Sequence, residues 1–276
     1  MTHLILVGID GSTSSSIAAA WAANLGFRTG APVIAVAAWN EPPTSFMDGG
    51  GDPALHRNSD MEDLATTTLH EAGVDGVRVT AIRGPITDTL LEAVDDFDAS
   101  MLVVGTRGLG ALSGLLLGSI SRRLMFSTRR PLVVVPRTWS LNPPEVTRVL
   151  VGVDRSEIAE RVLLWAARFC SEVGAPAAIV RCSSPGCERP PGHVDQIDDR
   201  ARSNVERALQ PFRDLGVEYS IVIAHCDPRV ALVENAQDGR ADLIVIGTRG
   251  QGQFSGLGGT ASYLARHSPV PLAVIP

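Results

Sequence analysis

The chain contains the same pattern twice, and the two copies together span nearly all of its 276 residues. Ile5-Leu6-Val7-Gly8-Ile9-Asp10-Gly11-Ser12 matches Val149-Leu150-Val151-Gly152-Val153-Asp154-Arg155-Ser156, and Gly30-Ala31-Pro32 matches Gly174-Ala175-Pro176. A repeat of this length predicts two domains of ordinary size rather than a solenoid of short units. We predict domains at residues 1–140 and 145–276, joined by a linker around Asn142-Pro143-Pro144.

Each half alternates short apolar runs with segments of helical periodicity. The first half predicts helices at Ser12 to Leu25, about 57–73, Ile86 to Asp95 and Ser119 to Phe126, and strands at 3–9, 32–39, 77–82, 101–104 and 132–135. The second half repeats the strands at 148–153, 177–182, 217–223, 242–246 and 271–275. Short apolar strands that alternate with helices predict an α/β fold with two tandem, doubly wound parallel sheets, each covered on both faces.

A glycine-rich phrase follows the fourth predicted strand of each half. Val104-Gly105-Thr106-Arg107-Gly108 reappears as Ile246-Gly247-Thr248-Arg249-Gly250, and the pairs Gly118-Ser119 and Gly259-Thr260 come later. A strand that runs into a glycine turn and then a helix exposes backbone N–H groups, which suit a phosphate. The alternative is structural: the glycines only permit a tight turn with positive φ.

An aspartate ends the first predicted strand of each half: Asp10 and Asp154. In open parallel sheets, ligands bind beyond the carboxyl ends of the strands, where the winding reverses. If the first and fourth strands are neighbours, the aspartate and the glycine loop face one crevice. The competing interpretation makes Asp10 the N-cap of the following helix.

All 24 basic residues are arginine, and the chain has no lysine. This excludes the P-loop and the protein-kinase site, which need a phosphate-binding lysine, and it excludes Schiff-base chemistry. Any phosphate must be held by backbone amides, hydroxyls, Arg107 or Arg249. A dinucleotide-binding motif is also excluded, because the glycines of that motif follow the first strand, whereas the glycine-rich phrase here follows the fourth.

The composition narrows the class of protein further. The net charge of −6 argues against a nucleic-acid partner, and no apolar run approaches the length of a membrane span. No export signal is evident, so we expect a cytoplasmic protein. The four cysteines form no CxxC motif and the six histidines show no metal-ligand spacing, so we expect structural thiols and no metal site.

The first-half motif resembles the ATP-binding signature of the universal stress protein family. The resemblance rests on Gly105-x-x-Gly108, nine further residues and Gly118-Ser119, together with the opening Val7 to Ser12 and the closing strand Pro131 to Pro136. It implies five-stranded sheets in the order 3-2-1-4-5, an adenine nucleotide α-hydrolase-like fold, and ATP bound between strands one and four. It also implies fifth strands that pair between domains or subunits, hence a homodimer or an intramolecular pairing of domains.

The resemblance also assigns roles to residues. Gly8, Ile9 and Asp10 would border the adenine and ribose, and the backbone of Ala38 would meet adenine. Gly105, Arg107 and Gly108 would wrap the ribose and α-phosphate, and the β- and γ-phosphates would meet Gly118, Ser119, Ile120 and Ser121. The corresponding residues of the second half are Val153, Asp154, Gly247, Arg249, Gly250, Gly259 and Thr260.

The second half departs from the pattern. Eight residues separate Gly250 from Gly259, one fewer than the family spacing, while Arg155 replaces Gly11 and Cys182 replaces Ala38. We therefore expect the first site to bind ATP better than the second.

For the whole chain we expect an ATP-binding, nucleotide-dependent regulator of the stress response, with Mg²⁺ as a candidate companion of ATP. A slow Mg²⁺-dependent ATP hydrolase or nucleotidyl-transfer enzyme stays open as an alternative. The absence of a clear general base or of a carboxylate pair for two metals argues against it. A dimerisation module that has lost its ligand is the third class, and the intact first motif argues against it.

Overall fold

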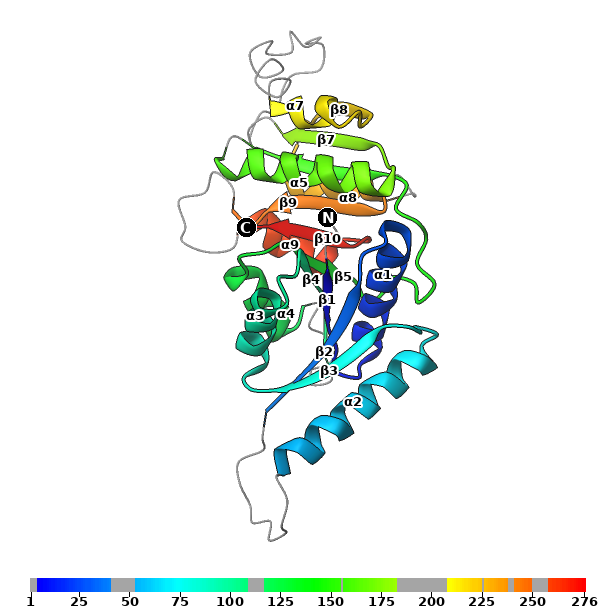
Figure 1. Ribbon diagram of the computed structural model, residues 1–276. Helices are drawn as coiled ribbons and strands as arrows, with labels where there is room; N and C mark the ends of the chain where they lie inside the picture. The colour runs from blue at the N-terminus through cyan, green and yellow to red at the C-terminus, as the bar shows by residue number, and fades with distance from the viewer. Residues whose placement is uncertain are drawn as a thin grey trace, which may run out of the picture. The chain divides into compact units, whose positions relative to one another are not determined.

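The computed structural model describes residues 4–40, 53–108, 117–154, 156–182, 208–224, 226–237, 241–249 and 258–276. Backbone contacts divide the chain into two compact units, one that ends at Glu145 and one that begins at Val146. Each unit is an α/β domain built on parallel strands (Figure 1). No described helix is both long and apolar enough to cross a membrane.

The first unit is a five-stranded sheet in the order β3-β2-β1-β4-β5. Its strands are β1 (Ile5–Gly8), β2 (Val33–Trp39), β3 (Arg78–Arg83), β4 (Met101–Gly105) and β5 (Leu132–Val135), and its helices are α1 (Thr13–Thr29), α2 (Pro53–Glu71), α3 (Ile86–Asp96) and α4 (Ser119–Ser127). The central strand β1 pairs in parallel with β2 on one side and with β4 on the other. The predicted strand order is therefore confirmed, and β1 and β4 are neighbours.

The second unit repeats this arrangement in the order β8-β7-β6-β9-β10. Its strands are β6 (Val149–Val153), β7 (Ala177–Cys182), β8 (Tyr219–Ala224), β9 (Leu243–Gly247) and β10 (Leu272–Ile275), and its described helices are α5 (Ile158–Val173), α7 (Gln210–Asp214), α8 (Pro228–Ala236) and α9 (Gly259–His267). The central strand β6 pairs with β7 and β9. The sequence repeat is thus a repeat of the fold.

Helices cover both faces of each sheet. In the first unit, a Cβ built on Gly8 would lie 3.2 Å from Leu90 of α3, whereas one built on Gly105 would meet Ser14 of α1. These two glycines face opposite sides of the sheet, because Val7 pairs with Val103 in register and side chains alternate along a strand. In the second unit, Gly152 faces Leu232 of α8 and Gly247 faces Ile158 of α5.

The long helix α1 begins and ends at residues suited to those positions. Ser12 is its N-cap and accepts a hydrogen bond from the Ser15 amide at 3.2 Å, and Gly30 ends it in the left-handed conformation at φ 70°. The predicted helix stopped at Leu25, four residues too early, because its apolar pattern ends before its glycine cap. The predicted start of α2 near residue 57 was late by a similar margin, since α2 begins at Pro53.

Candidate functional site

The carboxyl ends of β1 and β4 bring Asp10 and Gly108 together. Asp10 Oδ2 occupies the space that a Cβ on Gly108 would need, so only glycine allows the loop to approach this carboxylate so closely. Asp10 Oδ1 accepts a hydrogen bond from the Ser12 amide at 3.0 Å. The N-cap interpretation of Asp10 is wrong, because Ser12 caps α1 and Asp10 forms the turn before it. A half-buried carboxylate therefore borders the glycine loop.

The start of α1 holds the glycine loop through two serines. Ser14 Oγ accepts a hydrogen bond from the Arg107 amide at 3.3 Å, and Ser12 Oγ donates to the Arg107 carbonyl at 3.4 Å. Ser14 also packs against Gly105, where a Cβ would lie 2.6 Å from the Ser14 carbonyl oxygen. These serines were missed in the sequence. A run of hydroxyl residues in an otherwise alanine-rich, buried helix was the signal that pointed to them.

The helix after the loop begins without a side-chain cap. Gly118 is the N-cap of α4, and its own amide donates to the Thr106 carbonyl at 2.7 Å, which closes the base of the loop. Ser119 and Ile120 then open the helix, with Ser119 exposed and Ile120 half-buried. The first amides of a helix have no intrahelical acceptor, and the helix dipole adds positive potential there, so this end suits a phosphate.

Ser121 has a different role from the one predicted. It is 4 % exposed, and its hydroxyl donates to the Gly105 carbonyl at 2.8 Å. This hydroxyl hydrogen is therefore committed to the protein, so Ser121 can offer a phosphate only its backbone amide. Ser121 is better described as a support that fixes α4 to the end of β4.

The remaining predicted residues of the first unit lie at the same edge. Gly8 ends β1, and the Ile9 amide continues its pairing by donating to the Val36 carbonyl at 2.9 Å. Ala38 lies one residue before the end of β2 and is half-buried. Arg107 is half-buried, and no described residue forms an ion pair with its guanidinium. The structure thus brings all the predicted first-half residues to one edge of the sheet.

Among its described residues, the second unit shows no counterpart of the serine contacts to the loop. Ile158 takes the place of Ser14, and its Cγ2 would lie 2.7 Å from a Cβ on Gly247. The helix α5 begins at Ile158 with Glu157 as an N-cap that makes no side-chain hydrogen bond. Asp154 is exposed, and its Oδ1 accepts from the amide of Ser156 at 2.9 Å and also from the Ser156 hydroxyl. Apolar packing therefore replaces hydroxyl contacts at this loop.

The start of α9 corrects the predicted equivalence of Gly259 with Gly118. Gly258, not Gly259, is the N-cap of α9, and its amide donates to the Thr248 carbonyl at 2.9 Å as Gly118 donates to Thr106. The second loop is therefore two residues shorter than the first, rather than one. Gly259 takes the place of Ser119, and a Cβ on it would meet no atom within 4 Å.

Other second-half predictions are only partly described. Val153 ends β6 and is half-buried, Arg249 is exposed, and Thr260 lies in the first turn of α9. Gly250 and Arg155 lie outside the described residues.

The second unit also carries two thiols near this edge. Cys182 ends β7, and burial, with smaller contributions from Cys226 and Asp227, raises the pKa of its thiol to about 11. Asp227 caps α8 and binds the Arg229 guanidinium, which holds the pKa of the Asp227 carboxyl below its usual value. Among the described residues, no group of three or more potential ligands could hold a metal ion.

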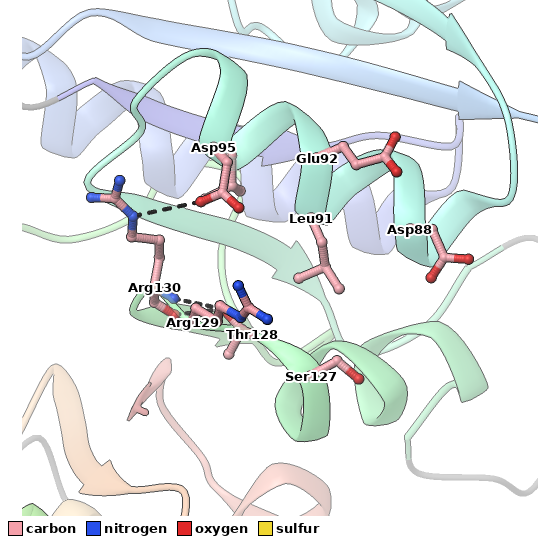
Figure 2. Close-up of a pocket in the computed structure, with 9 residues that line it drawn as sticks. Asp88, Leu91, Glu92, Asp95, Ser127, Thr128, Arg129 and Arg130 are labelled. Atoms are coloured by element: carbon pink, nitrogen blue, oxygen red, sulfur yellow. Dashed lines mark hydrogen bonds and ion pairs between the residues drawn. The ribbon is translucent and has the colours of Figure 1, made fainter.

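A separate hollow of about 310 Å³ lies elsewhere in the first unit, between α3 and the turn that leads into β5 (Figure 2). Acidic residues of α3 line one side, and Arg129 and Arg130 line the other. Arg130 turns toward α3, where its Nε lies 3.9 Å from Asp95 Oδ1. None of the predicted site residues lines this hollow, so it is distinct from the candidate site at the carboxyl edge of the sheet.

Comparison with known proteins agrees with the fold and the motif. The family model described as the universal stress protein family matches residues 1–136 and 145–276. A universal stress protein of Mycobacterium tuberculosis is 30% identical over 292 residues, covering 98% of this chain and 95% of the relative. One of Mycolicibacterium smegmatis is 27% identical, with coverage of 98% and 96%.

Among solved structures, a universal stress protein of Archaeoglobus fulgidus matches with a TM-score of 0.70 at 21% identity, covering 100% of this chain and 98% of that one. This likeness supports the fold alone. The two family matches, one on each repeat, and the relatives that align from end to end settle the family. The chain belongs to the universal stress protein family, with two such domains in tandem.

Proposed function

We propose that the first unit binds an adenine nucleotide, with ATP as the preferred ligand. The observation that carries this proposal is the close approach of the Asp10 carboxylate to Gly108 at the edge where α4 begins. A carboxylate is a good acceptor for ribose hydroxyls, and an uncapped helix start is a good donor to phosphates. This edge of the sheet therefore offers a hydrogen-bond acceptor for the ribose, the Asp10 carboxylate, and hydrogen-bond donors for the phosphates, the first amides of α4.

The same residues support binding rather than catalysis. Efficient phosphoryl transfer needs a positioned nucleophile and charge stabilisation that grows in the transition state. Here the proposed phosphate contacts are backbone amides with Arg107 nearby, and the carboxylate lies at the proposed nucleoside end. We therefore propose a cytoplasmic regulator whose nucleotide occupancy changes its conformation or its partners, with Mg²⁺ as a companion of the bound triphosphate.

The direct test of binding is mass spectrometry of the ligand released when the purified protein is denatured, followed by calorimetric titration of the emptied protein with ATP, AMP and a cyclic nucleotide. We expect an adenine nucleotide in the released fraction and tightest binding of ATP. Tighter binding of AMP than of ATP would contradict the phosphate assignment at α4.

The test against the enzyme alternative is steady-state phosphate release with Mg²⁺. We expect turnover far below roughly 1 s⁻¹, the slow end of typical enzymes. The control is the Asp10→Ala, Gly118→Asp double variant, which alters both proposed ends of the nucleotide. Turnover at or above that rate in the wild type, abolished in the double variant, would make the protein a hydrolase.

We also propose that the fifth strands mediate pairing, either between the two domains of one chain or between two copies. Light scattering of the full chain separates these possibilities. A monomeric mass supports pairing within the chain, and a dimeric mass supports a homodimer.

A further inference from the structure

Two cysteines lie at the ends of neighbouring strands in the second unit. Cys182 is the last residue of β7 and pairs in register with Ala224, the last residue of β8. Cys226 comes two residues later, is exposed, and carries a free thiol, as does the half-buried Cys182. Neighbouring strands lie about 4.8 Å apart, so Cys182 lies beside Ala224, and Cys226 follows Ala224 by two residues.

The path of the chain after β8 brings Cys226 toward Cys182. The helix α8 packs on β6 and β7, with Leu232 against Gly152 of β6. Because β7 lies between β8 and β6, a chain that leaves β8 for a helix packed on β6 and β7 passes the end of β7, and the described residues of this connection are Cys226 and Asp227. Cys226 lies in this crossing segment, immediately before Asp227, the N-cap of α8.

The first unit shows the same crossing in detail. Gly84 immediately precedes the N-cap of α3, as Cys226 precedes that of α8, and its amide donates to the Trp39 carbonyl at the end of β2 at 2.9 Å. The crossing residue thus lies against the end of the strand it passes, one position beyond Ala38, the counterpart of Cys182. In the second unit, the influence of Cys226 and Asp227 on the pKa of Cys182 agrees with this proximity.

We propose that Cys182 and Cys226 form a reversible disulfide that ties the crossing segment to the end of β7. A peroxide is the oxidant. Cys226, as its thiolate, attacks one peroxide oxygen to give a sulfenic acid and hydroxide, which takes up the proton lost by the Cys226 thiol. Cys182 gives its proton to the sulfenic oxygen and, as a thiolate, attacks the Cys226 sulfur. The S–S bond forms and water leaves, so two thiols and one hydrogen peroxide give one disulfide and two waters.

The disulfide has a consequence for the ligand, and this part rests on extending the proposed nucleotide binding to a weaker site in the second unit. Cys182 stands where the first unit has Ala38, at the edge proposed to meet the base. A bond that fixes the crossing segment beside this edge alters nucleotide binding in the second unit alone. The first unit has Ala38 and Gly84 at the two positions and contains no cysteine, so it serves as an internal control.

The experiment uses the full chain, treated with hydrogen peroxide, blocked with an alkylating reagent and digested without reduction. We expect a peptide that joins Cys182 to Cys226, lost after reduction and absent from Cys182→Ser and Cys226→Ser. The variants Cys170→Ser and Cys187→Ser should retain it. A link from Cys182 to Cys187, a link between chains, or oxidation of Cys226 without any link would each overturn the proposal.

A second measurement separates the disulfide from its consequence. Nucleotide titration of the reduced and oxidised protein should show a loss of affinity at the second site and no change at the first. An oxidised protein that carries the link but keeps both affinities refutes the effect on the ligand. A reduced protein that binds nucleotide at the first site alone refutes the effect on the ligand, and one that binds none at either site contradicts the proposed function; both leave the disulfide standing.

Discussion

The two units share one fold and differ at the edge where a ligand would bind. In the first unit, Ser14 of α1 and the N-cap Ser12 hydrogen-bond the backbone of Arg107, and the Ser121 hydroxyl donates to the Gly105 carbonyl. In the second unit, Ile158 and Ala261 replace Ser14 and Ser121, and the loop is two residues shorter. Both copies therefore keep the sheet and the backbone bond at the base of the loop, while among the described residues the serine hydrogen bonds to the loop are found in the first unit.

The comparison teaches that an intact glycine pattern is not sufficient to predict a site. Glycines allow another group to approach the loop closely, but whether that group is polar or apolar decides whether the loop is held by hydrogen bonds or by packing. Gly105 meets the polar Ser14, and Gly247 meets the apolar Ile158. We therefore expect the first unit to be the stronger nucleotide site, and the following changes test that difference.

The largest effect is expected from Gly118→Asp, which places a carboxylate at the start of α4. Repulsion and the loss of one or two charge-assisted hydrogen bonds, each about 1.5–3 kcal/mol, should weaken ATP binding more than tenfold in calorimetry. Gly118→Asn has nearly the same size without the charge and should weaken binding less. The equivalent Gly258→Asp should leave the tighter site unchanged. Equal ATP affinity of Gly118→Asp and the wild type would contradict the assignment of α4 to the nucleotide site.

The next largest effect is expected from Gly105→Ala, which should lower the free energy of unfolding. Its Cβ would lie 2.6 Å from the backbone oxygen of Ser14, and a backbone neighbour gives way less readily than a side chain. We expect a loss of about 1–3 kcal/mol in the free energy of unfolding in urea. Gly247→Ala should cost less, because its nearest neighbour is the Ile158 side chain. A larger loss in Gly247→Ala would reverse our view of which loop is held more firmly.

A smaller effect is expected from Ser121→Ala. The Gly105 carbonyl would lose its buried donor, at a cost of about 1 kcal/mol in the free energy of unfolding. Ser119→Ala, in the same turn, is the matched control, because Ser119 is exposed and makes no hydrogen bond with a described residue. Equal effects of the two substitutions would show that the Ser121 contact adds nothing.

The smallest effect is expected from Gly259→Ala. A Cβ there meets no atom within 4 Å, and alanine suits a helix better than glycine by at most about 1 kcal/mol. The free energy of unfolding should therefore stay the same or rise slightly. A clear loss of stability would mean that Gly259 is constrained as Gly118 is, which would restore the equivalence suggested by the sequence.

The ends of the strands could be predicted from sequence to within two residues, the largest differences being at the starts of β1 and β8. The inner strands are apolar and mostly buried, whereas the edge strands β3 and β8 are largely half-buried, and glycine or proline commonly stands beside strand ends, as Pro131 and Pro136 do beside β5. The order of the strands came from the family resemblance rather than from any local pattern. The meeting of Asp10 with Gly108 then followed from general rules about parallel sheets.

Two parts of the site could not be predicted. Residues 256–259 contain three glycines, and spacing alone cannot choose between Gly258 and Gly259; the hydrogen bond from the Gly258 amide to Thr248 decides it. The role of Ser14 depends on a contact with Arg107, 93 positions away in the sequence. Such a contact leaves no periodic signal in a single sequence.

The backbone bond at the base of each glycine loop has a consequence for how the repeats diverge. Thr106 with Gly118, and Thr248 with Gly258, bring the two ends of the loop together in the same way. With the ends held, a change of length alters only the entropy of loop closure, and removing two residues changes it by about 0.2 kcal/mol. Insertions and deletions in this segment are therefore nearly neutral for folding. After the duplication, each copy could accept a new loop, and hence a new ligand preference, without endangering the domain that carries it.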